Sequence, residues 1–199
     1  MESYKVMESF YSIQGEGYHT GKPAFFIRLA GCNIGCSWCD VKESWDEQNS
    51  TLRTVASLVN EAQNHQSERV IITGGEPTMY NLTALTNALQ KVGIKTHLET
   101  SGAYSITGSW DWVCISPKKF KSPLVSELNK ADELKVVILN STDLAWAEQH
   151  ANYVLQSCKL FLQPEWDKTD SIIARINNYV LEHPKWRISL QTHKYMNVR

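Results

Sequence analysis

Three of the five cysteines lie close together, at Cys32, Cys36 and Cys39, in the spacing C-x3-C-x2-C. Three thiolates on one loop are typical ligands of an iron–sulfur cluster or of a zinc ion. A structural zinc needs a fourth ligand, and no histidine lies within ten residues of this motif. The spacing alone leaves three alternatives: a three-cysteine cluster with one iron open to a small molecule, zinc completed by a distant residue, or no metal.

The apolar runs of the chain predict the elements that must position this loop. Short apolar runs mostly alternate with helical patterns, which predicts a parallel sheet with right-handed crossovers. Six core strands and 199 residues fall short of the eight strands and ~250 residues of a full barrel. We therefore predict an α/β fold, a partial, open TIM-like barrel of about six parallel strands in one domain. The predicted strands are residues 24–30, 69–73, 96–100, 112–115, 133–139 and 159–163.

Helical spacing predicts the elements between and after these strands. Three polar residues, 49–51, form a start signal for a helix whose apolar positions begin at Leu52. We predict further helices and one last strand, which are a helix over 82–92, a helix over 142–151, a helix over 169–183 and a strand over 186–191.

Polar motifs follow the carboxyl ends of most of the predicted strands. Ligands of parallel α/β sheets bind at that edge, so we expect these motifs to meet at one mouth. The motifs are the cysteine loop, Gly74-Gly75-Glu76-Pro77, Ser101-Gly102, Ser116-Pro117-Lys118 and Gln163-Pro164-Glu165.

Composition and charge exclude several classes of function. The formal net charge of −1 argues against a nucleic-acid partner. No apolar run approaches the ~18 residues of a membrane span, so we expect no membrane partner. The first residues lack a signal-peptide pattern, which predicts a cytoplasmic location. An odd number of cysteines in a reducing compartment favours a metal or redox role over disulfides.

The cysteine motif resembles the signature of the radical S-adenosylmethionine (SAM) enzymes. Gly74-Gly75-Glu76 resembles the second motif of that superfamily, which contacts the methionyl amino group of SAM. Residues 12–17 and 191–195, near the two ends of the chain, resemble the 7-carboxy-7-deazaguanine synthase family more specifically. The resemblance implies a carbon–nitrogen lyase that converts 6-carboxy-5,6,7,8-tetrahydropterin to 7-carboxy-7-deazaguanine and releases ammonia, in the biosynthesis of queuosine and other 7-deazapurines.

The resemblance also implies the cofactors, the partners and the residues that bind SAM. Cys32, Cys36 and Cys39 would ligate a [4Fe-4S] cluster within one radical SAM domain over residues 1–199, and SAM would chelate the fourth iron. The cluster and SAM would carry the reaction without a further catalytic side chain. A reductant such as flavodoxin or ferredoxin and a homodimer are implied as partners. The implied SAM contacts are Trp38, Cys39, Asp40, Gly75, Ser116, Pro117, Lys118, Gln163, Pro164, Glu165 and Trp166.

The residues implied to bind the pterin substrate come from both ends of the chain and from two strands. Arg28 lies inside an apolar strand, so it either meets a buried acidic residue or faces the mouth and binds the substrate carboxylate. The family also uses a terminal carboxylate, which here would be that of Arg199. The implied substrate contacts are Ile13, Gln14, Gly15, Arg28, Thr73 and Arg199.

The sequence departs from the family pattern at one position. Family members usually place a hydroxyl residue directly after the aspartate that follows the third cysteine, and this hydroxyl ligates Mg²⁺. Val41 stands there and has no side-chain oxygen, although magnesium prefers oxygen ligands. We therefore assign no magnesium ligand and leave the use of the ion open.

Two alternative functions remain at the level of sequence. One is a radical SAM activase acting on a glycine of another protein, against which the two terminal motifs argue. The other is a non-enzymatic protein, either an Fe–S electron carrier or a zinc-binding module. A carrier usually supplies four thiolates to each cluster, and the fourth is missing from this motif.

Overall fold

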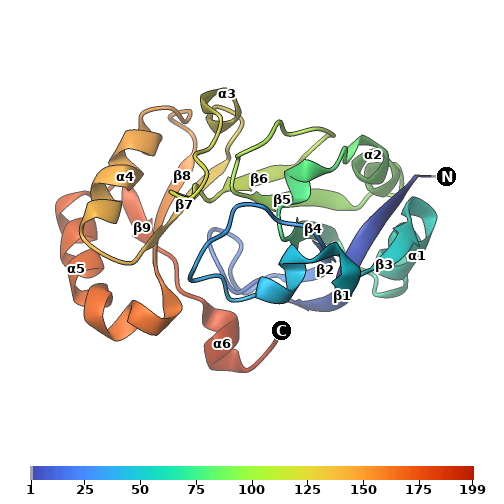
Figure 1. Ribbon diagram of the computed structural model, residues 1–199, viewed down its shortest axis with the longest axis horizontal. Helices are drawn as coiled ribbons and strands as arrows, with labels where there is room; N and C mark the ends of the chain where they lie inside the picture. The colour runs from blue at the N-terminus through green and yellow to red at the C-terminus, as the bar shows by residue number, and fades with distance from the viewer. Residues whose placement is uncertain (1) are drawn as a thin grey trace.

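The computed structural model describes residues 2–199, so that Met1 lies outside the described part of the chain. Nine strands form one curved sheet in the order β3-β1-β2-β4-β5-β6-β7-β8-β9, with helices along its outer side (Figure 1). The two ends of this order are not paired with each other, so the sheet is open. The strands are β1 (Ser3–Ile13), β2 (Pro23–Leu29), β3 (Thr51–Thr54), β4 (Arg69–Gly74), β5 (Lys95–Thr100), β6 (Trp112–Ile115), β7 (Glu133–Ile138), β8 (Lys159–Pro164) and β9 (Trp186–Ile188).

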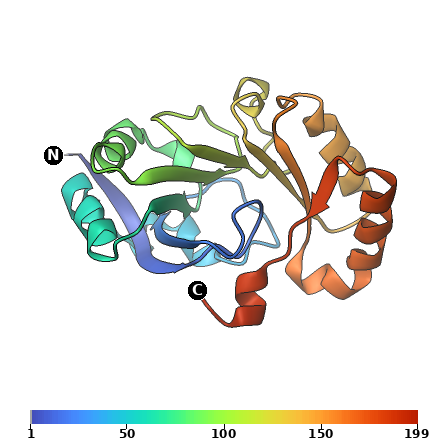
Figure 2. The same ribbon diagram turned by 180° about the vertical axis from the view of Figure 1, so that it is seen from behind.

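The helices connect the parallel strands and follow them in the chain. Figure 2 shows from behind how they surround the sheet, with the C-terminal helix near the loops of the first two strands. The α-helices are α1 (Val55–Asn64), α2 (Thr83–Lys91), α3 (Val125–Leu128), α4 (Thr142–Ala151), α5 (Thr169–Glu182) and α6 (Thr192–Met196). Short 3-10 turns are η1 (Lys42–Trp45), η2 (Glu47–Asn49), η3 (Pro77–Met79) and η4 (Trp166–Lys168).

The predicted α/β fold with an open parallel sheet is confirmed. All six predicted core strands occur, as β2 and β4 to β8, and each pairs in parallel with its neighbour. The last predicted strand, β9, adds in parallel to β8. On the other side β1 and β3 extend the sheet with antiparallel pairs.

The predicted helix start at residues 49–51 is wrong. Those residues end the turn η2 and begin β3, an edge strand that pairs with the start of β1. The helix begins only at Val55, where the Oγ1 of Thr54 accepts a hydrogen bond from the Ser57 N–H at 3.2 Å. Thr can cap a helix and is also common in strands. Pairing of residues 51–54 with the start of β1 therefore decides that this segment is a strand.

Side chains along a strand alternate between the two faces of the sheet: one face packs in the apolar core under the helices, and the other faces the concave side. In β7, Leu134, Val136 and Ile138 belong to the main apolar core, whereas Glu133 and Lys135 are also buried but lie outside it. Successive side chains of a strand point to opposite faces, so these two charges must face the inner, concave side. The fold therefore places apolar residues under the helices and polar residues inside the barrel-like curve.

None of the helices in residues 2–199 combines the length and the apolar character that a membrane crossing needs.

We expect Leu85→Ala to lower the free energy of unfolding by about 2–5 kcal/mol, because it opens a cavity in a close-packed core. Leu85 is fully buried in α2, whereas Leu181 is 82% exposed in α5. The matched change Leu181→Ala should shift stability by no more than ~0.5 kcal/mol. Urea unfolding followed by circular dichroism measures both, and equal effects would contradict the core described above.

Candidate active site

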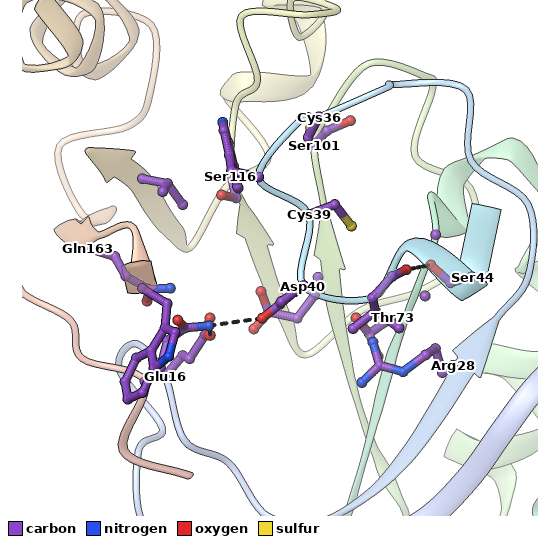
Figure 3. A pocket seen from close by; sticks show the side chains of 18 of the residues that line it. Glu16, Arg28, Cys36, Cys39, Asp40, Ser44, Thr73, Ser101, Ser116 and Gln163 are labelled. Carbon is purple, nitrogen blue, oxygen red and sulfur yellow. Dashed lines mark hydrogen bonds between the residues drawn. The ribbon is translucent and has the colours of Figure 1, made fainter. Parts of the chain in front are cut away.

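A cavity of about 510 Å³ opens at the carboxyl ends of the parallel strands. Its volume lies within the ~300–1,000 Å³ of small-molecule sites. Figure 3 shows side chains from the cysteine loop and from several strand ends around this one space. The predicted convergence of the strand-end motifs therefore occurs: each of them contributes at least one lining residue, as do both ends of the chain.

The three cysteines line this cavity, and none of them forms a disulfide. Their loop packs on Ile34 and Ala103, which gives it an apolar base. Burial raises the pKa of Cys36 to about 11, and the charges of the other two thiolates add to this effect against that of Lys118. Burial likewise raises the pKa of Cys32.

The donor set suits an iron–sulfur cluster. A metal centre would offset the cost of ionising neighbouring thiols, because thiolate ligands are deprotonated when they bind metal. Within residues 2–199, no set of three or more His, Cys, Asp or Glu side chains is arranged to hold a single metal ion. In a [4Fe-4S] cluster each cysteine would ligate a different iron, so the three sulfur atoms do not need to converge on one point.

Gly74 and Gly75 let the end of β4 approach the start of the cysteine loop. A Cβ on Gly75 would lie 2.3 Å from the Gly31 carbonyl oxygen and 2.8 Å from Cys32 Cβ. The backbone N–H of Gly75 donates to the carbonyl of Leu29 at 2.9 Å. Glycine is therefore required here by close packing against the cysteine loop.

Glu76 joins the loops that follow β4 and β5. It is 2% exposed, and its carboxylate accepts hydrogen bonds from backbone and hydroxyl donors of Thr78, Thr100 and Ser101. Its own N–H donates to the Gly31 carbonyl at 2.9 Å. A buried carboxylate with so many donors is a fixed structural junction rather than a free acid or base.

Nearly all predicted SAM contacts meet in the cavity. Pro117 is the exception, since it borders a second, small cavity of about 30 Å³ behind Trp38. Burial lowers the pKa of Lys118, whose Nζ donates to Ser116 Oγ at 2.5 Å and lies 5.1 Å from the centre of the Trp38 ring. The residues that line the main cavity are Trp38, Cys39, Asp40, Gly75, Ser116, Lys118, Gln163, Pro164, Glu165 and Trp166.

The predicted substrate contacts also line the cavity, as Ile13, Gln14, Gly15, Arg28, Thr73 and Arg199. The sequence leaves two alternatives for Arg28: pairing with an acidic residue, or facing the cavity. The structure shows both an acidic partner and a position in the cavity lining. Its Nε donates to Glu8 Oε1 at 2.7 Å, and no other residue among 2–199 accepts a hydrogen bond from its guanidinium group. Glu8 also accepts from Arg199 at 2.7 Å. The remaining Arg28 nitrogens are thus available to an anion in the cavity.

Sequence reasoning missed an ion network at the centre of the cavity. Lys135 Nζ lies 2.7 Å from Glu16 Oε2 and 3.0 Å from Glu99 Oε2. Gln14 Nε2 donates to the other oxygen of Glu99 at 3.2 Å. Burial alone would raise the pKa of Glu16, but Lys135 holds it at about 2. Burial would lower the pKa of Lys135, and the surrounding anionic groups hold it well above its ordinary value.

Residues near the C-terminus form one wall of the cavity. Gln191 Nε2 donates to Glu16 Oε1 at 2.8 Å and to Asp40 Oδ2 at 3.2 Å, and the second of these bonds is visible in Figure 3. The Thr192 N–H donates to the Gly15 carbonyl at 2.9 Å. His193 packs so closely on Gly15 that a Cβ there would lie 2.2 Å from His193 Nδ1. The terminal motifs of the sequence therefore contact each other.

Val41 lines the cavity but offers no side-chain oxygen for a magnesium ion. The Val41 carbonyl accepts a hydrogen bond from Ser44 Oγ at 2.7 Å. The carboxylate of Asp40 accepts from Gln191 and lies 3.3 Å from Lys194 Nζ. Since position 41 carries no hydroxyl, we assign no magnesium ligand and derive no step through the ion.

These features define a radical SAM enzyme. The Radical SAM superfamily profile matches residues 26–108, which include the three cysteines and the Gly-Gly-Glu motif. The chain belongs to the 7-carboxy-7-deazaguanine synthase family, and thus to lyases of 7-deazapurine biosynthesis that use SAM and a [4Fe-4S] cluster.

Two relatives and one solved structure illustrate this membership. The chain is 48% identical to the 7-carboxy-7-deazaguanine synthase of Flavobacterium psychrophilum, over 99% of this chain and 93% of the relative. It is 47% identical to that of Synechocystis sp., over 99% and 94% of the two chains. The crystal structure of QueE from Escherichia coli matches with a TM-score of 0.84 at 29% identity, over 94% of this chain and 93% of that one.

Glu133 lies at the amino end of β7, opposite the carboxyl-end edge that carries the cysteine loop. Its Oε2 accepts hydrogen bonds at 3.1 Å from the Tyr18 N–H and from Trp112 Nε1, while its buried Oε1 has no partner among residues 2–199. Burial raises its pKa to about 7, although the charge of Lys135 opposes this shift. Burial therefore shifts Glu133 toward its protonated form relative to a free glutamate.

We expect Cys36→Ala to prevent loading of a [4Fe-4S] cluster, because one iron would lose its thiolate. Cys158→Ala is the matched control, since Cys158 is also a buried free cysteine but does not line the cavity. Iron and sulfide content and visible absorbance after anaerobic reconstitution measure the result. Equal loading of the two variants would show that Cys36 is not a ligand.

A second prediction concerns pH. The folded pKa of Glu133, about 7, exceeds its ordinary value of 4.5, so its contribution to stability is complete below about pH 4.5 and is lost as pH rises through about 7. Glu133→Gln should remove this pH dependence. As pH rises between these two values, the free energy of unfolding of the variant should therefore gain on the order of 1–3 kcal/mol relative to that of wild type. Chemical unfolding at pH 5 and pH 8 tests it. The exposed control Glu182→Gln should follow wild type, and a Glu133→Gln variant that does the same would refute the assignment.

Proposed function

We propose that this enzyme converts 6-carboxy-5,6,7,8-tetrahydropterin to 7-carboxy-7-deazaguanine with release of ammonia. The observation that carries the proposal is one cavity that holds the three cysteines together with a partly free arginine and a ring of amide and carboxylate groups. The first part suits the cluster and SAM, and the second suits a flat, hydrogen-bonding ring that bears an anion.

Cys32, Cys36 and Cys39 hold the cluster in this proposal. When bound, the cluster and SAM supply the one-electron chemistry that starts a radical reaction. The SAM-binding residues surround that position from four strand ends, and Lys118 lies close enough to bond a ribose hydroxyl or a carboxylate. The side chain of Pro117 takes part only by shaping the turn between Ser116 and Lys118.

Arg28 binds the substrate carboxylate through the nitrogens that Glu8 leaves free. Gln14, Glu16 and Glu99 face the amide and amino edges of the pterin ring, because amides and carboxylates can pair with such donors and acceptors. Lys135 keeps Glu16 ionised and also pairs with Glu99, so that both carboxylates offer oxygens as acceptors. Ile13, Gly15, Thr73 and the carboxylate of Arg199 complete the substrate wall.

Three further features belong to the proposal. The enzyme works without a magnesium ligand at Val41, it acts as a homodimer, and flavodoxin or ferredoxin reduces it. Five free cysteines support a reducing compartment, and we place the reaction in the cytoplasm.

Family membership decides against the activase and against the non-enzymatic metal protein.

Anaerobic reconstitution with iron and sulfide, followed by dithionite, SAM and the carboxy-tetrahydropterin, tests the proposal. We expect 5′-deoxyadenosine, 7-carboxy-7-deazaguanine and ammonia, each quantified by chromatography or a coupled assay. Deoxyadenosine without deazaguanine would refute the proposed substrate.

Arg28→Gln should raise the KM for the pterin by ~10-fold or more, since a charged hydrogen bond contributes about 1.5–3 kcal/mol. Reductive cleavage of SAM without the pterin should continue in this variant. Arg187→Gln is the matched control, because Arg187 is an exposed arginine in strand β9 and does not line the cavity. An unchanged KM in Arg28→Gln would place the substrate carboxylate elsewhere.

A further inference from the structure

One side of the cysteine loop carries an unbalanced run of basic residues. Residues 112–126 contain three lysines and no acidic residue. Lys118 turns into the cavity, whereas the side chain of Lys119 is 42% exposed. Lys119 Nζ pairs with the buried carboxylate of Asp143 and donates to Thr142 Oγ1 at 3.1 Å, while part of its side chain stays exposed.

Large apolar side chains lie among these lysines. Phe120 is 49%, Leu124 41% and Val125 57% exposed. We call Lys119, Phe120, Lys121, Leu124 and Val125 the basic patch. Apolar side chains grouped with basic ones suit a protein partner better than a small molecule, since aromatic residues supply contact area and the charges orient the encounter.

The basic patch touches the cysteine loop directly. Lys121 Nζ donates to the Tyr104 hydroxyl at 2.6 Å, and that hydroxyl donates to Asn33 Oδ1 at 2.5 Å. Asn33 follows Cys32 in the chain and is itself exposed. A protein bound to the patch would therefore lie against the loop that holds the cysteines.

The other side of the loop has the opposite charge. Residues 42–49 carry three exposed acidic side chains, Glu43, Asp46 and Glu47, against one lysine. This segment packs on β1, whereas the basic patch follows β6, and β2, β4 and β5 separate these two strands in the sheet. Glu47 pairs with Lys5, so Glu43 and Asp46 carry the negative charge on this side, and the contrast with the basic patch steers an acidic partner to the patch.

We propose that the basic patch is the docking surface for a small acidic protein that carries one electron to the cluster. This inference rests on the proposed function, because that reaction requires a reduced cluster. With a flavodoxin as carrier, the anionic flavin hydroquinone becomes the neutral semiquinone as one electron passes to the oxidised [4Fe-4S] cluster. No proton and no further reactant are needed for this step.

The test compares two double variants of the reconstituted holoenzyme. Lys119→Gln/Lys121→Gln removes the charges of the patch, and each glutamine keeps an N–H donor for Asp143 or Tyr104. Lys95→Gln/Lys159→Gln is the matched control, since these exposed lysines stand at the amino ends of β5 and β8, on the opposite edge of the sheet. The readouts are the Kd for a flavodoxin at two salt concentrations, and turnover driven by that flavodoxin or by dithionite.

We expect the patch variant to bind flavodoxin ~10-fold more weakly at low salt, with a matching loss of flavodoxin-driven turnover. The difference should shrink at high salt, because screening weakens exposed charge pairs. Dithionite-driven turnover and the control variant should equal wild type.

Each other outcome has a definite meaning. Wild-type binding by the patch variant, or weaker binding by the control alone, overturns the docking surface. A loss of dithionite-driven turnover in the patch variant with an unchanged Kd also overturns it, because the lysines would then act on the cavity. Failure of the wild-type enzyme to form deazaguanine with dithionite refutes the proposed function, while the Kd values still test the docking surface.

Discussion

The close contact between the end of β4 and the start of the cysteine loop is the constraint on which the site depends. Gly74 and Gly75 have no side chain, so the β4 backbone can lie against Leu29 and Gly31 at distances that a Cβ would forbid. Glu76 then fixes the next loop through its buried hydrogen bonds. The cysteine loop consequently stands against the ends of three neighbouring strands, β2, β4 and β5.

The same sheet supplies the polar half of the cavity through its alternation. Lys135 is buried between apolar neighbours that face the helices, and an unpaired ammonium there would be costly. Glu16 and Glu99 offset that cost, and they come from the loop after β1 and from β5. The network therefore requires β1, β5 and β7 to keep their register, which links the stability of the fold to the polarity of the site.

Sequence patterns predicted the parts of this structure that depend on local periodicity. The six core strands and the motifs at their ends follow from short apolar runs, because such runs need no knowledge of their neighbours. The register between distant strands is not local, and so the pairing of Lys135 with Glu16 could not be predicted, although Glu16 lies in the motif 12–17 and Lys135 in a predicted strand. The strand Thr51–Thr54 was missed for a similar reason, since its partner is the start of β1.

The ends of the chain explain why the cysteine motif indicates only a superfamily, whereas the terminal motifs indicate a family. The cysteines lie in the region that matches the superfamily profile, which many reactions share, and they pack with Ile34 of their own loop and with Ala103. Gln191 and His193, in contrast, bond or pack against the loop of Gly15 and Glu16, which lines the cavity. A change in that contact alters the shape of this wall of the cavity. The two terminal motifs therefore form one structural unit, which makes them informative as a pair.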